Sequence, residues 1–493
     1  MSLDAVKHII LVMFENRSFD HVLGWMSHPR YGNDPRIEGL VGDVDPATGA
    51  IENDDYENDA AGFPFQPFFS DADEPFLSDL PHGREAVTTQ MAFDRVHGRW
   101  TMRGFADSFF HENPNMGRIN PTPPGNLRML GPSAAPMTAF LARNYCVCDH
   151  WFTPIPTDTH PNRFMALAGY TKIDRTQGGF PEPDHDLMFD WAKDNDVPWR
   201  VYSDAFSFCS LMLKRLPDTL TDRDHFRRFD RFARDFANDP DFPSLVLLEP
   251  QFADDPFASA PSDNHPPFPM GPGESFLLQI YQALCGSTAA RARWAETMLV
   301  VYYDEHGGLF DHVPPLGITT TCGRDPGEPR WPAFATTGPR VPAIVASPLV
   351  ETGSVFSGNL DHTSVLRFLA DRFTPGRAYD DRVKDRHASG VLHSLGAVLT
   401  RDVARETPAP PLLGPFQQIA FPSGRPAVTD GQRSFLGARE QAHENHTDAL
   451  ASMHPEDFFV PRPAEPSRTP GASSIPRSAR PAARSSSTWS RGT

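Results

Sequence analysis

The sequence contains no apolar run that approaches the roughly 20 residues needed to cross a membrane. Positive charge is also scarce, because 45 Lys and Arg face 63 Asp and Glu and give a net charge of -18. This balance disfavours a nucleic-acid partner, since Lys and Arg bind the phosphate backbone. Five Cys in 493 residues do not make a disulfide scaffold. Cys146 and Cys148 would share one face of a strand, where pairing is geometrically awkward, so we expect free or core thiols.

We also expect that the N-terminus carries no secretory signal peptide. Lys7 and His8 interrupt this region, and the apolar run 9–14 that follows is too short for a signal. We therefore expect either a cytoplasmic chain or one whose export signal has been removed, and the sequence does not separate the two. The run 9–14 is better interpreted as the first buried strand.

Short apolar runs and helical patterns alternate along the chain. Continuous runs of this length indicate strands buried on both faces, as in a parallel sheet, and the alternation with helices predicts an open α/β fold. Long loops at about 43–82 and 250–272 are of the kind that carries binding residues. The predicted strands are 9–14, 199–202, 245–248, 298–303 and 343–346, and the predicted helices are 18–26, 161–169, 274–284 and 363–373.

The pattern weakens after about residue 400. We expect a main domain over residues 1–400 and a small C-terminal extension over 401–460. Residues 461–493 are rich in Pro, Ser, Ala and Arg, a composition typical of a disordered tail.

Acidic pairs follow two of the predicted strands. Glu15 and Asn16 come directly after 9–14, and Asp304 and Glu305 come directly after 298–303. In open α/β sheets, ligands bind outside the carboxyl ends of the strands, so the two pairs can converge on one site. Their donors are all oxygens, which suits one hard divalent cation, and Ca²⁺, Mg²⁺ or Mn²⁺ is favoured over Zn²⁺. The alternative is that they are ordinary turn residues.

Thr159 lies at the start of the predicted helix 161–169, in the segment Thr-His-Pro-Asn-Arg. A helix N-terminus attracts phosphate, and a hydroxyl there can attack phosphorus if a metal or base activates it. A plain N-cap threonine is the alternative. Three histidines in polar settings, His82, His265 and His362, are candidates for holding phosphate or protonating a leaving alkoxide.

Taken together, these segments resemble the bacterial phosphoesterase family, which contains phosphatidylcholine-type and plant non-specific phospholipases C and an acid phosphatase branch. The combination of Glu-Asn-Arg-Ser-Phe-Asp-His with Tyr-Asp-Glu-His-Gly-Gly is specific, and the motifs keep the family's order from about residue 6 to 373. The segments that carry the resemblance are 8–24, 159–163, 263–267, 303–313 and 361–369.

The resemblance implies an alkaline-phosphatase-like, mostly parallel central sheet flanked by helices. It also implies roles for individual residues: a nucleophile that touches the metal for Thr159, and phosphate-site histidines for His265 and His362. Glu15 and Asn16 match the first metal motif, and Asp304 and Glu305 match the second. His82 matches more loosely, because the family's Asp-Pro is Leu80-Pro81 here.

We therefore expect a phosphoric ester hydrolase that forms a phosphothreonine intermediate, with His265 as the first choice for general acid. A phospholipase C-type phosphodiesterase is the leading hypothesis. An acid phosphatase-type phosphomonoesterase is the second, and a catalytically silent binding protein is the third. A phospholipid substrate would bring transient contact with a membrane surface. The lipid headgroup and the oligomeric state are not decided by the sequence.

Overall fold

The structure is a computed structural model, and it describes residues 3–60, 62–112, 123–255, 261–320, 331–413 and 429–445. The predicted tail over 461–493 therefore lies outside the described residues. Within the described part, no helix is both long and apolar enough to span a bilayer. Cys146 and Cys148 are buried free thiols, which confirms the expectation from their spacing.

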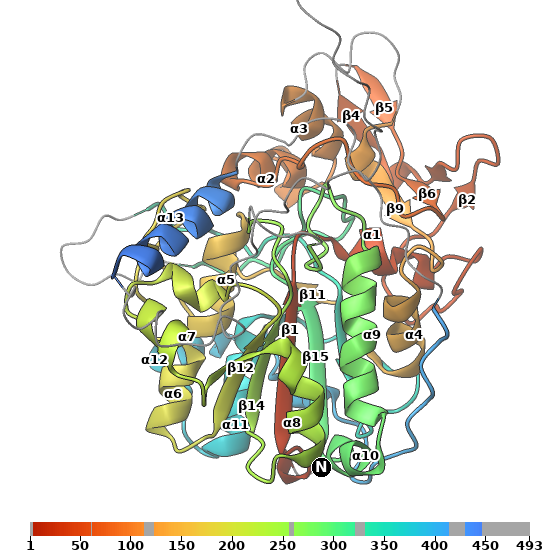
Figure 1. Ribbon diagram of the computed structural model, residues 1–493. Helices are drawn as coiled ribbons and strands as arrows, with labels where there is room; N and C mark the ends of the chain where they lie inside the picture. Colours follow the sequence, from red (N-terminus) through yellow and green to blue (C-terminus); the bar gives the residue numbers. More distant parts are fainter. Residues whose placement is uncertain are drawn as a thin grey trace, which may run out of the picture. The chain divides into compact units, whose positions relative to one another are not determined.

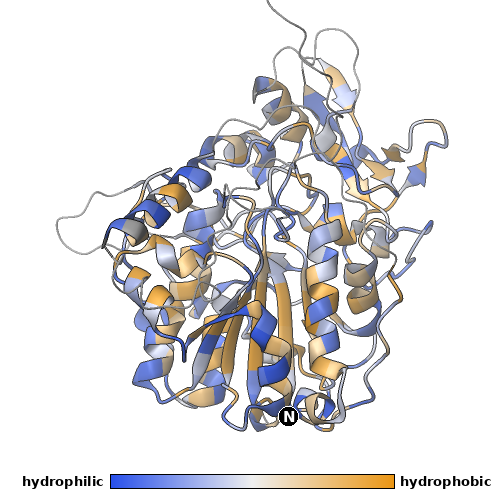
Figure 2. Ribbon diagram, viewed as in Figure 1, coloured by the Kyte–Doolittle hydropathy of each residue, from blue (hydrophilic) through white to orange (hydrophobic). Residues whose placement is uncertain are grey.

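An eight-stranded sheet forms the centre of the protein, and its strands are orange in the hydropathy view (Figure 2). All five strands predicted from apolar runs belong to it, and each is buried along almost its whole length. The eight strands are β1 (His8–Phe14), β10 (Cys146–Cys148), β12 (Trp199–Ser203), β13 (Phe226–Arg228), β14 (Leu245–Glu249), β15 (Thr297–Tyr303), β16 (Ala343–Ala346) and β17 (Val355–Phe356).

The order of the strands is β13-β12-β14-β1-β15-β16-β10-β17. β1 lies in the middle and pairs in parallel with both β14 and β15. β16 runs antiparallel to β15 and to β10, so the sheet is mostly rather than wholly parallel. This arrangement confirms the predicted α/β class, and it brings the carboxyl ends of β1, β14 and β15 to one edge of the sheet.

Helices flank the sheet on both faces (Figure 1). α9 packs with α4, α8 and α10, and α11 packs with α5. The helices are α1 (Phe19–Leu23), α2 (Arg84–Met91), α3 (Phe105–Glu112), α4 (Pro136–Asn144), α5 (Thr159–Ala168), α6 (Met188–Asp194), α7 (Leu216–Thr221), α8 (Phe232–Asn238), α9 (Gly271–Cys285), α10 (Thr288–Trp294), α11 (Thr363–Phe373), α12 (Asp381–His387) and α13 (Asp430–Asn445).

The long loop predicted over 43–82 contains several short strands. Phe65 and Phe69 are buried in the core and Phe68 is half-buried, whereas Phe63 is exposed. Packing therefore accounts for three of the four Phe in this loop. The short strands outside the central sheet are β2 (Asp43–Val44), β3 (Ile51–Glu52), β4 (Asn58–Ala60), β5 (Phe63–Phe65), β6 (Phe68–Ser70), β7 (Phe93–Asp94), β8 (Arg99–Trp100), β9 (Arg128–Leu130), β11 (Trp151–Phe152) and β18 (Leu360–Asp361).

Candidate active site

The two acidic pairs are neighbours in space because β1 and β15 are paired in register. Phe14 lies opposite Tyr303, so the residues that follow these two strands leave the sheet at the same level. The backbone N–H of Asn16 donates to Asp304 Oδ1 at 3.0 Å, and the N–H of Asp304 donates to the carbonyl of Phe14 at 3.0 Å. The pairing of the two strands therefore brings the two acidic pairs together, as predicted.

The turn after β15 depends on glycine. Gly307 has a φ of 64°, and an added Cβ there would overlap the backbone of Asn16. The Gly307 N–H donates to Glu305 Oε2 at 2.8 Å and thereby fixes one carboxylate oxygen. Only glycine meets both the positive φ and the close approach without strain.

Thr159 is the first residue of α5, one position inside the helix rather than at its N-cap. Asp158 occupies the N-cap position. The Thr159 hydroxyl donates to Asn16 Oδ1 at 3.3 Å, and the side chain is almost fully buried. The hydroxyl therefore faces the strand-end residues instead of capping its own helix, as a plain N-cap threonine would do.

Arg163 is a further site residue, which the sequence reasoning had not assigned. One turn beyond Thr159 on α5, it places a guanidinium nitrogen 2.7 Å from Glu15 Oε1 and its Nε 3.3 Å from Asp304 Oδ2. Its i+4 spacing from Thr159 was the available signal, because residues four apart share one face of a helix. Arg163 thus connects the helix that begins at Thr159 to both acidic pairs.

Three buried carboxylate oxygens at this site lack a hydrogen-bond partner among the described residues: Glu15 Oε2, Asp304 Oδ2 and Glu305 Oε1. Burial raises the pKa of Glu15 and Glu305 well above the ordinary value, although Arg163 opposes this effect at Glu15 and His82 opposes it at Glu305. Crowded carboxylate oxygens with unfilled hydrogen-bonding capacity are what a hard cation binds. With Asn16 Oδ1 and the Thr159 hydroxyl beside them, the residues present fit one divalent cation.

His82 and His265 flank Asn16, with their rings 5.9 Å apart. The Nε2 atoms of His265 and His82 lie 2.9 Å and 3.4 Å from the Asn16 amide nitrogen, and each Nδ1 donates to a backbone carbonyl. Burial disfavours charge on His82, but Asp79, Glu305 and Asp158 outweigh it and raise its pKa to about 10. Ligand atoms of Asp79, His82 and His265 lie within 4.8 Å of one another, so this trio is a second group that can hold a cation.

His362 forms hydrogen bonds through both of its ring nitrogens, to Trp151 and to the backbone of Asp304. Its Nδ1 accepts from the Trp151 indole at 3.0 Å, and its Nε2 donates to the carbonyl of Asp304 at 2.7 Å. Burial lowers the pKa of His362 to about 4, so the ring is neutral near pH 7. Of the three predicted histidines, His82 and His265 come together beside Asn16, whereas His362 holds the backbone of Asp304.

A pocket of about 150 Å³ opens onto Thr159. Its lining contains no Lys or Arg among the described residues. The lining residues are Asp79, His82, Asp158, Thr159, Thr176, Asp254, His265, Thr429, Asp430 and Gly431.

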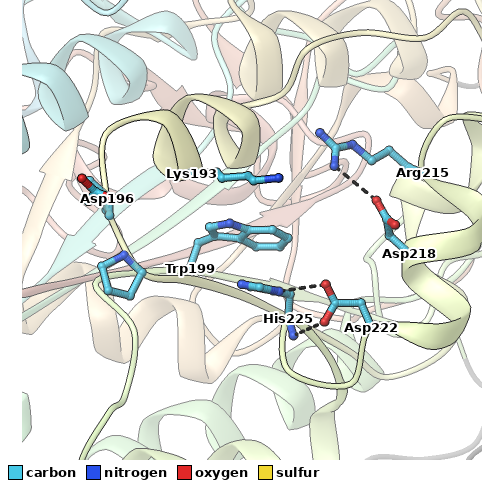
Figure 3. A pocket seen from close by; sticks show the side chains of 9 residues that line it. Lys193, Asp196, Trp199, Arg215, Asp218, Asp222 and His225 are labelled. Atoms are coloured by element: carbon cyan, nitrogen blue, oxygen red, sulfur yellow. Dashed lines mark hydrogen bonds and ion pairs between the residues drawn. The ribbon is translucent and has the colours of Figure 1, made fainter.

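A larger pocket of about 420 Å³ lies elsewhere, at the amino end of β12 beside Trp199 (Figure 3). Two pairs form among its charged groups: Asp222 accepts from His225 at 2.8 Å, and Arg215 lies 3.4 Å from Asp218. It contains none of the converging residues at the ends of β1 and β15. The smaller pocket is therefore the candidate active site, despite its size.

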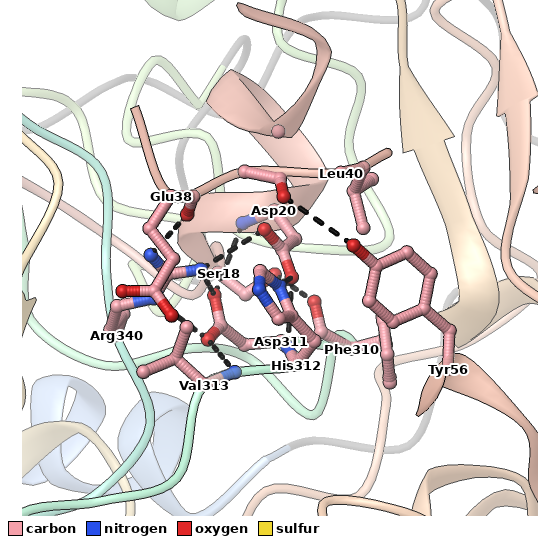
Figure 4. A network of polar contacts seen from close by, with 12 residues as sticks. Ser18, Asp20, Glu38, Leu40, Tyr56, Phe310, Asp311, His312, Val313 and Arg340 are labelled. Atoms are coloured by element: carbon pink, nitrogen blue, oxygen red, sulfur yellow. Dashed lines mark hydrogen bonds and ion pairs between the residues drawn. The ribbon is translucent and has the colours of Figure 1, made fainter. Parts of the chain in front are cut away.

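A buried charge network supports the two turns that follow β1 and β15 (Figure 4). Arg340 donates from Nε to Asp311 at 2.9 Å and from a terminal nitrogen to Asp20 at 3.1 Å, and all three side chains are fully buried. His312 Nδ1 lies 2.6 Å from the second Asp20 oxygen, Oδ2. Because Asp20 follows β1 and Asp311 follows β15, Arg340 ties together the two segments that supply the acidic pairs.

Comparison with known proteins identifies the family. The model of the Phosphoesterase family matches residues 6–374. Non-specific phospholipase C6 of Arabidopsis thaliana is 30% identical over 370 residues, which are 71% of this chain and 63% of that protein. Non-hemolytic phospholipase C of Burkholderia pseudomallei is 27% identical over 424 residues, covering 75% of this chain and 55% of that protein.

Phospholipase C B of Mycobacterium tuberculosis is 26% identical over 407 residues, covering 75% of this chain and 74% of that protein. The match spans less than two thirds of the length of the Arabidopsis relative. Among solved structures, a protein in the alkaline phosphatase superfamily from Vibrio parahaemolyticus gives a TM-score of 0.27 at 10% identity, covering 49% of this chain and 61% of that chain.

Proposed function

The chain belongs to the Phosphoesterase family, and from this premise we propose that it hydrolyses phosphodiesters of phospholipase C type with Thr159 as nucleophile. The observation that carries the proposal is the set of contacts at Thr159. Its hydroxyl lies 3.3 Å from Asn16 Oδ1 in a pocket that also exposes His82 and His265. Nucleophile, metal-type oxygens and proton-carrying groups thus meet at one point, as the chemistry requires.

A threonine hydroxyl is a weak nucleophile at neutral pH and needs activation. Glu15, Asn16, Asp304 and Glu305 would hold a divalent cation together with Thr159, and that ion would stabilise the alkoxide and the charge on the phosphate oxygens. Asn16 orients the Thr159 hydroxyl through its side-chain oxygen. The start of α5 adds a positive dipole end near the phosphate.

The reaction then proceeds in two displacements. Thr159 loses its hydroxyl proton to solvent, Thr159 Oγ forms a bond to phosphorus as the bond from phosphorus to the alcohol oxygen breaks, and His265 gives that oxygen a proton. Water then attacks the phosphothreonine, with His265 taking a proton from the water. The bond between phosphorus and Thr159 Oγ breaks, Thr159 Oγ regains a proton from solvent, and the phosphate product is released. His82 lines the same side of the pocket and binds a phosphate oxygen, while His362 positions Asp304.

The charges around the pocket favour a diester over a monoester. Four acids and no Lys or Arg line it among the described residues, and the nearby Arg163 is engaged by Glu15 and Asp304. His82, whose pKa is raised, supplies one positive charge to the pocket. A monoester carries a second negative charge that needs an extra cationic partner, whereas a diester carries one. Phospholipids are phosphodiesters, and the relatives are named phospholipases C. We therefore place phospholipids first among the possible substrates.

The test is a panel of nitrophenyl phosphodiesters and nitrophenyl phosphate with wild type, Thr159→Ala and Thr159→Ser, assayed with added Ca²⁺, Mg²⁺ or Mn²⁺. We expect metal-dependent turnover of diesters, a loss of several orders of magnitude in Thr159→Ala, and partial activity in Thr159→Ser. Preferential turnover of the monoester would instead support the acid phosphatase alternative. Absence of any metal-dependent turnover in wild type would support a silent binding protein.

A further inference from the structure

The pocket has a wall that lies outside the part of the chain matched by the family. Thr429, Asp430 and Gly431 line the pocket with Thr159 and His265, although the family match ends at residue 374. We propose that helix α13, together with Thr429 before it, limits the size of the second substituent on the substrate. This proposal rests on the proposed phosphodiesterase function.

Helix α13 is amphipathic, and its apolar face is packed against the protein. Ser434, Phe435, Ala438 and Ala442 are buried and recur at helical spacing, while Glu440 on another face is exposed. The Phe435 ring lies 5.5 Å from that of Phe206 and 5.9 Å from that of Phe252. The helix lies beside α7 in Figure 1. The wall is thus fixed by packing rather than by a single contact.

Hydrogen bonds hold the start of α13 at the pocket. The Thr429 hydroxyl donates to Asp254 Oδ1 at 2.8 Å, and the Gln432 amide donates to the carbonyl of Ala253 at 3.2 Å. An added Cβ at Gly431 would overlap the Asp254 carboxylate, which shows how closely the two segments approach. Because Asp254 also lines the pocket, the two segments form one continuous wall.

A second line of contacts runs from α13 to the nucleophile's helix. The Ser434 hydroxyl donates to Glu182 Oε1 at 3.2 Å, and the same oxygen lies 2.8 Å from His160 Nδ1. Glu182 and His160 are almost fully buried, and His160 directly follows Thr159. The position of α13 is therefore coupled to the residue that adjoins the nucleophile.

A pocket of about 150 Å³ leaves little room beyond the phosphate group itself. The substituent that remains on phosphorus after the first displacement must fit against the wall or extend past it. Displacing α13 should therefore open the pocket to bulkier substituents, while the leaving group and its chemistry stay the same.

The experiment compares methyl and benzyl nitrophenyl phosphate, which share a leaving group and differ in the second substituent. Gly437→Val pushes α13 away at a point outside the pocket, because even a Cβ there would lie 2.7 Å from the Phe180 Cβ. Phe435→Asp displaces the helix by another route, since it places a charge beside Phe206 and Phe252. Glu440→Gln, on the exposed face of α13, is the matched control.

We expect both displacing variants to raise the ratio of kcat/KM for the benzyl ester to that for the methyl ester by about tenfold or more, the scale of discrimination by pocket size. The control should keep the wild-type ratio. Wild-type ratios in both variants, with faster amide exchange over 429–445, would overturn the proposal. Wild-type ratios with unchanged exchange would overturn it too, because they would show that these contacts do not fix the wall. Failure of wild type to hydrolyse either ester would contradict the proposed function instead.

Discussion

Replacing Arg340 by Met is predicted to be among the most destabilising single changes in the buried interior near the site. Arg340 donates to Asp311 and Asp20, and also to the carbonyls of Glu38 at 2.6 Å and Asp149 at 2.9 Å. Methionine fills a similar volume but leaves two buried carboxylates without their cation. Removal of one partner from a buried ion pair costs about 3–5 kcal/mol, because the remaining charge stays uncompensated.

The cost should depend on pH in a defined direction. Burial raises the pKa of Asp311 to about 6, and Arg340 opposes that rise. A carboxyl whose pKa is raised by folding contributes stability below its unfolded pKa, and this contribution is lost as pH rises through the folded value. Loss of Arg340 raises the folded-state pKa of Asp311 further. At the lower of two pH values Asp311 is therefore more often protonated and uncharged, and the free-energy cost of losing Arg340 is smaller. The variant should therefore lose more stability at about pH 7.5 than at about pH 5.5.

Urea unfolding of wild type and Arg340→Met at both pH values measures this effect. Arg175→Met is the matched control, because Arg175 forms an exposed pair with Glu85 at 3.0 Å and such pairs contribute about 1 kcal/mol or less. Adding Asp311→Asn to Arg340→Met should recover part of the loss, since it removes one unpaired charge. The reasoning is refuted if Arg340→Met costs no more than Arg175→Met, or if its cost is greater at the lower pH.

Three further predictions concern the site and the core. His265→Ala should lower kcat/KM by about 10²-fold or more for an alkyl ester but less for a nitrophenyl ester, whose leaving group needs no proton; equal losses would contradict the general-acid role. Ca²⁺ or Mn²⁺ at 100 times its Kd should stabilise wild type against thermal unfolding by about 2–3 kcal/mol. Asp304→Asn should lose this stabilisation, whereas the control Asp381→Asn, on the exposed surface, should keep it. Burial raises the pKa of Glu274 to about 7, so its contribution to stability should fall by up to about 3 kcal/mol as pH rises from about 4.5 to 7. In urea unfolding over this pH range, Glu274→Gln should show a smaller loss of unfolding free energy than wild type.

The sheet was predictable because its strands are buried on both faces and appear as continuous apolar runs. The predicted strand 298–303 differs from β15 by one residue, and 343–346 coincides with β16. The antiparallel direction of β16 was not predictable, because a buried strand has the same apolar pattern in either direction. The short strands within 43–82 were missed because two or three residues give no measurable periodicity.

The site was predictable where chemistry and position coincide in the sequence, as at Glu15 and Asp304. Their proximity depends on the register of β1 with β15, which joins residues almost 300 positions apart and leaves no local signal. The same limit explains why Asp254 and Gly431 were missed, since their roles come from a contact between distant segments. The sequence also suggested a phosphate-facing role for His362, whereas its contacts with Trp151 and Asp304 favour a positioning role.

The charges at the candidate site bear on how so acidic a protein could bind the anionic substrate proposed for it. Glu15, Asp304 and Glu305 are buried beside two cationic side chains, the Arg163 guanidinium and His82, so the three carboxylates are not fully compensated when all are ionised. Arg163 reaches Glu15 and Asp304 from the α5 side only, and each of the three carboxylates keeps one oxygen without a hydrogen-bond partner among the described residues. One divalent cation would supply the missing charge and bind those oxygens at the same time. A monovalent cation would only neutralise this group of charges, whereas a divalent cation would leave it net positive toward a phosphate, so the arrangement favours a divalent ion.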